Sequence, residues 1–209
     1  MKKPRFSIII PAFNSENYIR KALDSVDEQI FKDYELIVVC DSCYDRTLEI
    51  AKRYTDLVYK VEFGDDGLTR NYGIEQANGE YILFLDDDDW FLHEYVLNLL
   101  DNMLDQNDNP PDILAFGFIW KHIGYCRNLI DNMYISVWNK CWRREAIGET
   151  RFSDRQMASD EDFHNAMMKK DLKIVCWDMP MYYYNFMREG SQTYLKKLEE
   201  ITKSIIKEE

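Results

Sequence analysis

Four consecutive aspartates, Asp86 to Asp89, follow the apolar segment 81–85 and precede Trp90 and Phe91. Adjacent carboxylates repel one another, so such a run needs either a cation or open exposure to water. Mg²⁺ and Mn²⁺ prefer oxygen ligands and take one or two carboxylates together with substrate phosphates. The run therefore predicts either a solvated turn or a divalent metal site that gathers a diphosphate. The apolar flanks favour the metal site.

Two other segments place polar residues directly after an apolar run. Residues 11–14 follow the run 6–10, and Asp41 follows the run 34–40. Because helical patterns separate the apolar runs, the strands are predicted to be parallel. The carboxyl ends of parallel strands meet at one edge of a sheet, which is where ligands bind in such folds. We therefore expect the three polar segments to converge there.

The elements that position these residues are predicted from hydrophobic periodicity. Near-continuous apolar runs predict buried strands at 6–10, 34–40, 57–63 and 80–85. Helical spacing predicts intervening helices over 14–29, 45–55 and 68–79, the first capped by Asn14 or Ser15 and the third closed by Gly79. The second half predicts helices at 93–106 and 160–170 and strands at 113–120, 134–142, 173–177 and 181–186. This pattern predicts an α/β fold with a central, mostly parallel sheet flanked by helices.

Composition narrows the range of partners. The chain of 209 residues carries a formal net charge of −12 and has a pI near 4.8. Nucleic-acid binding depends on Lys and Arg neutralising phosphates, so a nucleic-acid partner is not expected. Five cysteines, an odd number, predict reduced thiols and a cytoplasmic protein. No signal peptide is predicted, and no stretch approaches the roughly 20 apolar residues of a membrane span.

Several motifs in order resemble glycosyltransferase family 2, the large inverting family with the GT-A fold. Segment 6–26 resembles its opening strand and Pro-x-(Tyr/Phe)-Asn turn, and 34–47 its Asp-Gly-Ser-x-Asp-x-Thr region. Segment 68–90 resembles its Ala-x-Arg-Asn-x-Gly and Leu-Asp-x-Asp-Asp motifs. Weaker landmarks follow at 137–147, 151–152, 159–163 and 182–193. The resemblance covers about residues 5–193. The motifs are specific to the family when taken together, whereas no single motif is.

The resemblance implies roles at the matched positions. Asp88 would bind Mn²⁺ or Mg²⁺ directly, with Asp86 nearer the ribose and the metal's waters, and Asp41 would accept a hydrogen bond from the base. The nucleotide-binding set would comprise Pro11, Ala12, Phe13, Asn14, Asp41, Arg70, Asp86 and Asp87. Asp162 would be the catalytic base, and Arg188 and Ser191 would contact the diphosphate.

The resemblance also implies a reaction and a domain plan. A GT-A domain would span 1–193, with a nucleotide-binding half at 1–106, an acceptor half at 112–193 and a C-terminal helix at 194–209. The reaction would be inverting transfer from a nucleotide-diphosphate sugar, a UDP-sugar, to a hydroxyl of a glycan or lipid-linked saccharide. Such acceptors imply a cytoplasmic enzyme attached peripherally at the inner face of the membrane.

Some positions keep a second interpretation. Asp162 also fits an acid in the first turn of a helix, and residues 188–191 also fit a polar surface turn. Lys140, Arg143 and Arg144 fit either contacts to an anionic donor or a basic surface. Ser42 and Cys43 replace the family's Gly-Ser, which leaves the base specificity open. For the whole chain, the alternative is an inactive nucleotide- or sugar-binding module with the same fold.

Overall fold

The computed structural model describes residues 3–106, 109–155 and 158–186. In the first half, strands and helices alternate as β1 (Phe6–Ala12), α1 (Ile19–Asp27), β2 (Tyr34–Asp41), α2 (Thr47–Ala51), β3 (Val58–Val61), α3 (Asp66–Gln76) and β4 (Tyr81–Phe84). The second half contains β5 (Trp90–Phe91), α4 (Val96–Asp105), β6 (Ile113–Trp120), β7 (Gly124–Cys126), β8 (Lys140–Arg143), α5 (Arg144–Ile147), α6 (Ser159–Met168) and β9 (Ile174–Tyr184). The predicted C-terminal helix at 194–209 lies outside the described residues.

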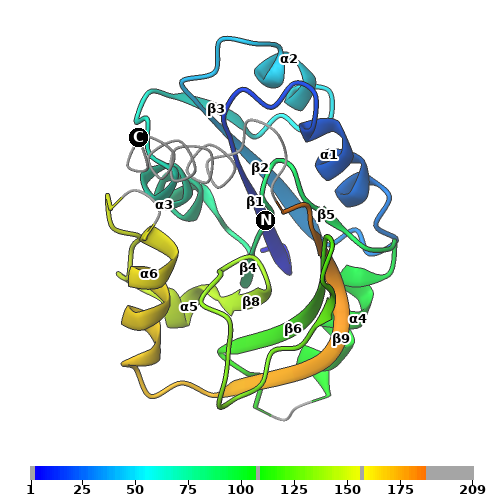
Figure 1. Ribbon diagram of the computed structural model, residues 1–209, viewed down its shortest axis with the longest axis vertical. Helices are drawn as coiled ribbons and strands as arrows, with labels where there is room; N and C mark the ends of the chain where they lie inside the picture. Colours follow the sequence, from blue (N-terminus) through cyan, green and yellow to red (C-terminus); the bar gives the residue numbers. More distant parts are fainter. Residues whose placement is uncertain (1–2, 107–108, 156–157, 187–209) are drawn as a thin grey trace, which may run out of the picture.

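One mixed sheet joins the two halves in the order β3-β2-β1-β4-β8-β6-β9-β5, with β7 paired to β6 (Figure 1). The strands β3, β2, β1 and β4 are parallel to one another. Strand β8 is antiparallel to β4 and to β6, whereas β9 runs parallel to β6. The predicted α/β fold with a central sheet is therefore present; the sheet is mixed, and its continuous parallel part is formed by β1 to β4.

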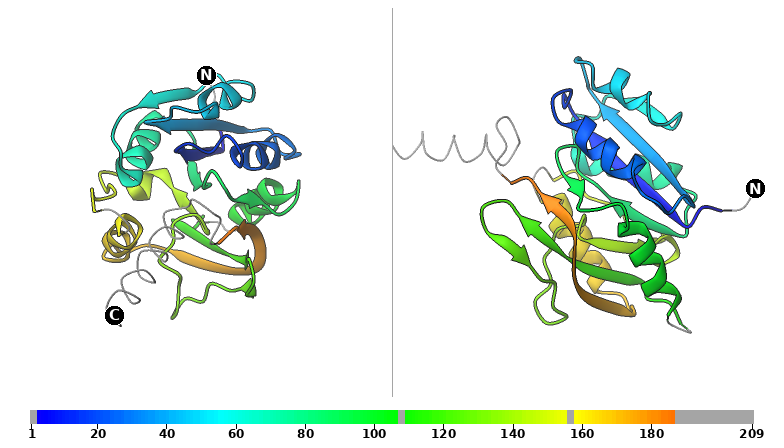
Figure 2. Two further views of the ribbon diagram at one scale, coloured as in Figure 1. Left: turned by 45° about the horizontal axis from the view of Figure 1, so that its top comes forward. Right: turned by 90° about the vertical axis from the view of Figure 1, so that its right-hand side faces the viewer.

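The parallel strands are buried on both faces because helices cover both. Side chains at successive positions of β1, Ile8, Ile9 and Ile10, are all fully buried. Helices α1 and α2 contact each other, and α3 contacts α6. Figures 1 and 2 show α1 and α2 on one side of the parallel strands and α3 and α6 on the other.

The helices of the first half are shorter than predicted. Helix α1 begins at Ile19 without a side-chain cap, because the carbonyl of Ser15 accepts from the backbone N–H groups of Tyr18 and Ile19 in a preceding turn. Helix α2 ends at Ala51. Helix α3 ends at Gln76, so Gly79 does not close it.

Gly79 is required for a different reason. A Cβ atom there would lie 2.5 Å from the backbone nitrogen of Ser7, so only glycine allows this approach to β1. The backbone N–H of Gly79 instead donates to the hydroxyl of Ser7. The glycine therefore sets how closely β4 enters the sheet beside β1.

The second half corrects two strand predictions. Of the predicted strand 134–142, only residues 140–142 are in a strand, β8, which continues to Arg143. The two predicted strands at 173–177 and 181–186 are a single long strand, β9, which pairs with β6 through a register shift near Gly117. Among the described residues, no helix combines the length and apolar composition needed to cross a bilayer.

Candidate active site

The predicted convergence of polar loops at the carboxyl edge of the parallel strands is present. The backbone N–H of Phe13, just after β1, donates to the carboxylate of Asp87 at 3.1 Å. The neighbouring Asn14 accepts from the backbone N–H of Tyr44, in the loop after β2, at 3.0 Å. Loops after β1, β2 and β4 are therefore hydrogen-bonded to one another, with the Phe13 side chain 56% exposed beside them.

The aspartate run alternates between buried and partly exposed side chains. Asp87 and Asp89 are buried, whereas Asp86 and Asp88 remain partly accessible. The hydroxyl of Tyr182 donates to Asp89 at 2.7 Å, and Asp87 accepts from Phe13. The run is therefore not a solvated turn: two of its carboxylates hold the loop in place, and the other two remain partly accessible.

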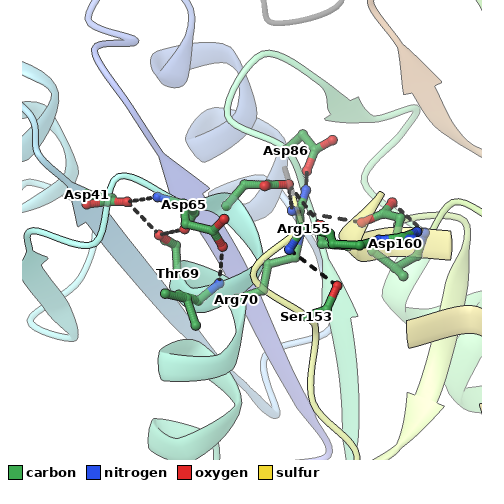
Figure 3. A network of polar contacts seen from close by, with 12 residues as sticks. Asp41, Asp65, Thr69, Arg70, Asp86, Ser153, Arg155 and Asp160 are labelled. Atoms are coloured by element: carbon green, nitrogen blue, oxygen red, sulfur yellow. Dashed lines mark hydrogen bonds and ion pairs between the residues drawn. The ribbon is translucent and has the colours of Figure 1, made fainter. Parts of the chain in front are cut away.

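Arg70, on α3, lies at the centre of an acidic cluster (Figure 3). It donates to Asp66 at 2.6 Å and to Asp86 at 2.8 Å, and its Nη1 lies 3.9 Å from Asp160. Burial opposes the charge of Arg70, but Asp86, Asp160 and Asp66 outweigh that effect and raise its pKa above the ordinary value. Among the described residues, its buried Nε has no partner. This Nε is buried as well as unpartnered, so it is not exposed to a ligand in this arrangement.

The carboxylates present fit a divalent metal that arrives with its substrate. Among the described residues, no group of three or more His, Cys, Asp or Glu side chains could hold a metal by itself. Asp86 and Asp88 supply two partly exposed carboxylates. Mg²⁺ commonly combines one or two carboxylates with phosphate oxygens and water. This pair is therefore sufficient only together with the oxygens of a ligand such as a nucleotide diphosphate.

Asp41, at the end of β2, organises the loop that leads to α3. Its two oxygens accept from Ser42 Oγ, Thr69 Oγ1 and the backbone N–H groups of Phe63, Gly64 and Asp65, all within 3.0 Å. Burial opposes ionisation, but the hydrogen bonds from Gly64, Ser42, Asp65 and Thr69 lower the pKa of Asp41. An ionised carboxylate has about four acceptor sites, so these five donors already fill it. A hydrogen bond from a nucleobase to Asp41 would have to displace one of them.

The loop after Asp41 keeps a glycine-like backbone without glycine. Ser42 has a φ of 50°, in the left-handed region that favours glycine. Its hydroxyl donates to Asp41 at 2.9 Å, and the thiol of Cys43 lies 3.3 Å from the carbonyl of Ala12. The side chains that replace the family's Gly-Ser are thus accommodated within the same loop, at a conformational cost at Ser42.

The two candidate acids at the start of α6 point to different surroundings. Asp160 lies near Arg70 and accepts from the backbone N–H of Val137 at 3.3 Å. Asp162 instead accepts from Ser153 Oγ at 2.5 Å and Arg155 Nε at 2.9 Å. Burial raises the pKa of Asp160; Arg70 opposes this shift and Asp86 adds to it. The structure therefore joins Asp160, not Asp162, to the Arg70 cluster.

Lys140 is neither an exposed surface charge nor a donor contact. Its side chain is fully buried, and its ammonium donates to the carbonyls of Tyr134 and Ser136 and to the side chain of Asn139. Burial lowers the pKa of Lys140 to about 7. Both sequence-based interpretations of Lys140 are therefore wrong: the lysine fastens the segment that leads from Tyr134 into β8.

Sequence reasoning missed Asp66, Asp160 and Tyr182. Residues two apart on a helix point roughly 200° apart, so Asp160 and Asp162 could not both face the cluster, but the sequence did not say which one would. Asp66 and Arg70 have the i,i+4 spacing of a helical ion pair, which was the available signal for Asp66. The predicted diphosphate residues Arg188 and Ser191 lie outside the described residues.

A family model described as "Glycosyl transferase family 2" matches residues 7–174. The chain belongs to this family. Glycosyltransferase GlyA of Streptococcus pneumoniae serotype 4 is 26% identical over 217 residues, which cover 90% of this chain and 31% of GlyA. The chain spans about a third of the length of the curated relatives that it matches first.

Two solved structures share the architecture of this chain. TarS 1–349 of S. aureus, determined in complex with UDP-GlcNAc, has a TM-score of 0.78 and 25% identity, covering 91% of this chain and 60% of TarS. The mannosyltransferase PcManGT of Pyrobaculum calidifontis, in complex with GDP-Man and Mn²⁺, has a TM-score of 0.71 and 15% identity, covering 93% and 60%. The second likeness supports the fold alone.

Proposed function

We propose that this family 2 chain is an inverting, metal-dependent glycosyltransferase that uses a UDP-sugar. The observation that carries the proposal is the cluster formed by Asp86, Arg70 and Asp160 at the carboxyl edge of the parallel strands, with Asp88 partly exposed beside it. Metal-ligating carboxylates, a cation and a further carboxylate are the groups that transfer from a nucleoside diphosphate requires.

The donor would bind along the loops after β1, β2 and β4. The exposed ring of Phe13 is available to stack on the base, next to the backbone of Pro11, Ala12 and Asn14. Asp86 and Asp88 would hold Mn²⁺ or Mg²⁺, which when bound neutralises the diphosphate. Arg70 would hold Asp86 in place and bring its positive charge near the diphosphate or the ribose. Asp41 would act on the base mainly through the loop that it holds, because its own acceptor sites are filled.

We assign the catalytic base to Asp160 in preference to Asp162. The acceptor hydroxyl would transfer its proton to a carboxylate oxygen of Asp160, and its oxygen would form a bond to the anomeric carbon. The bond from that carbon to the diphosphate breaks on the opposite face, and the nucleoside diphosphate leaves with the electron pair. Asp162 is occupied by Ser153 and Arg155, so it would have to break two contacts to act.

The acceptor is proposed to be a hydroxyl of a surface glycan or a lipid-linked saccharide. The relatives include TarS, named as a poly(ribitol-phosphate) β-N-acetylglucosaminyltransferase, and GgaB, named as a minor teichoic acid biosynthesis protein. The first name gives poly(ribitol-phosphate) as the acceptor, and the second refers to the synthesis of teichoic acid. A peripheral site of action at the inner face of the membrane would follow if the acceptor carries a lipid.

The test is calorimetric titration of UDP, and then of GDP, with and without Mn²⁺. The proposal expects UDP binding that requires Mn²⁺ and is lost in Asp88→Ala, while circular dichroism of that variant is unchanged. The chain would then be incubated with UDP-GlcNAc, and hydrolysis or transfer followed by NMR, which also reports the anomeric configuration of the product. Absence of UDP binding both with and without Mn²⁺ would refute the proposal. Binding with neither transfer nor hydrolysis would favour the inactive-module alternative.

A further inference from the structure

Asp89, the last residue of the aspartate run, is used differently from the residues proposed to contact the donor. Its side chain is fully buried. One carboxylate oxygen accepts from the Tyr182 hydroxyl at 2.7 Å, and the other accepts from the backbone N–H of Asn185 at 2.7 Å. Both partners belong to the end of β9 or the residue just after it. Asp89 therefore fastens the aspartate loop to a segment from the far end of the described chain.

Tyr182 contacts both ends of the aspartate run with one hydroxyl group. The hydroxyl donates to Asp89 and accepts from the backbone N–H of Asp86 at 3.1 Å. The backbone N–H of Asp89 donates to the carbonyl of Asp86 at 3.1 Å, which closes the turn between them. The backbone direction at Asp86, and hence at Asp88 within the same turn, is thus fixed by one phenol oxygen.

The ring of Tyr182 is itself held firmly. It is fully buried and stacks on Trp138 with ring centroids 4.6 Å apart and an interplanar angle of 16°. Tyr182 also pairs with Phe91 across the β5–β9 ladder. Because both the ring and its strand are fixed, the hydroxyl can serve as a rigid reference point for the loop.

We propose that Tyr182 and Asp89 form a positioning pair that sets the geometry in which Asp86 and Asp88 bind a divalent metal with a nucleoside diphosphate. This inference rests on the proposed function, since it concerns the same metal and nucleotide. Neither side chain touches the donor; both act through the backbone of the 86–89 turn. Orientation within a fraction of an ångström is what such sites require from their supporting residues.

The competing explanation is that the pair only stabilises the fold. A buried carboxylate that accepts two hydrogen bonds would contribute to stability at any position in the fold. Its loss would lower the melting temperature. A purely stabilising pair would leave the metal-dependent affinity of the folded variant unchanged. The two explanations therefore differ in a binding measurement made well below the melting temperature.

The experiment compares Tyr182→Phe with Tyr183→Phe in the full chain. Tyr183 is the adjacent residue of β9, and its ring stacks on Trp90 at 4.1 Å between centroids. Each variant keeps its ring and loses one hydroxyl. UDP affinity would be measured by calorimetry across a series of Mn²⁺ concentrations, at a temperature where circular dichroism shows each variant folded. We expect at least tenfold weaker Mn²⁺-dependent UDP binding in Tyr182→Phe and wild-type binding in Tyr183→Phe.

Asp89→Asn provides the second variant in case Tyr182→Phe does not fold. The amide keeps the side-chain shape and one acceptor for Asn185 but replaces the second oxygen with a donor, so we expect a similar loss of affinity. Wild-type affinity in a folded Tyr182→Phe or Asp89→Asn protein would overturn the positioning role and leave the proposed function standing. A wild-type chain that binds no UDP with Mn²⁺ would overturn both.

Discussion

Arg70 donates to Asp86 across 2.8 Å and so joins α3 to the turn that follows β4. The same guanidinium also neutralises Asp66, one helical turn earlier, and Asp160, at the start of α6. Three carboxylates from three elements can lie this close only because a buried cation lies among them. The arginine is therefore both a structural centre and a part of the candidate site.

Replacing Arg70 with an uncharged residue is expected to lower the free energy of unfolding strongly. Arg70→Met leaves three carboxylates facing one another in a partly buried cluster, and loss of one partner of a buried ion pair costs about 3–5 kcal/mol. Arg53→Met is the matched control, because Arg53 forms an exposed i,i+4 pair with Glu49 at 2.6 Å. Exposed pairs contribute about 0.3–0.5 kcal/mol. Urea unfolding should show the large loss only for Arg70→Met, and equal losses would contradict the account of the cluster.

The assignment of the base separates two neighbouring acids. Asp160→Asn is expected to slow sugar transfer by roughly 10²- to 10⁴-fold, the usual contribution of a positioned general base. Asp162→Asn should keep most of the wild-type rate, because its carboxylate contacts Ser153 and Arg155 instead of the cluster. The transfer rates of the two variants would be measured in single turnovers at saturating donor. Mn²⁺-dependent UDP binding serves as the control that each variant is folded. The opposite ranking would return the role to Asp162.

Ser42 offers a test of backbone conformation. With a φ of 50°, it occupies a region that costs a side-chain-bearing residue about 1–2 kcal/mol relative to glycine. Ser42→Ala keeps that cost and loses the hydrogen bond to Asp41, whereas Ser42→Gly loses the bond but removes the cost. Despite the greater flexibility of glycine in the unfolded chain, we expect the glycine variant to be more stable than the alanine variant by about 1 kcal/mol in urea unfolding. An alanine variant of equal or greater stability would show that the turn is relaxed.

The buried lysine should make stability depend on pH. Burial lowers the pKa of Lys140 to about 7 in the folded state, against an ordinary value of 10.5, with Asp160, Cys176 and His164 as the titratable groups that interact with it. Between these values the unfolded state binds more protons, so the free energy of unfolding rises with pH. The slope has an upper limit of about 1.4 kcal/mol per pH unit. Lys140→Met should flatten the rise between pH 7 and 9, and an unchanged slope would contradict the assignment.

Local periodicity was sufficient to predict the parallel half of the sheet. Runs such as Ile8–Ile10 are apolar at successive positions, which is the pattern of a strand covered on both faces, and β1 is buried in that way. Helix ends were predicted less well. Alternatives to a helical cap, such as the turn at Ser15 and the contact of Gly79 with Ser7, depend on hydrogen bonds and neighbours that spacing does not reveal.

The candidate site was predicted in its location but only partly in its members. The aspartate run and Arg70 lie together as expected, because strand ends converge in any parallel sheet. The choice between Asp160 and Asp162 depends on the rotation of α6 against α3, and the burial of Lys140 depends on the path of the segment before β8. Both are tertiary features, so no local pattern in the sequence could determine them.

The bond between Asp89 and Asn185 joins positions 96 residues apart in the chain. Translation delivers the amino-terminal half first, and the aspartate turn then emerges without Tyr182 or Asn185 to satisfy its buried carboxylate. A nascent chain that has been extended only to β8 therefore has the parallel strands β1 to β4, but its aspartate turn is not yet fastened. Under the proposed function, competence to hold a donor would therefore follow the synthesis of β9 and not that of the parallel strands alone.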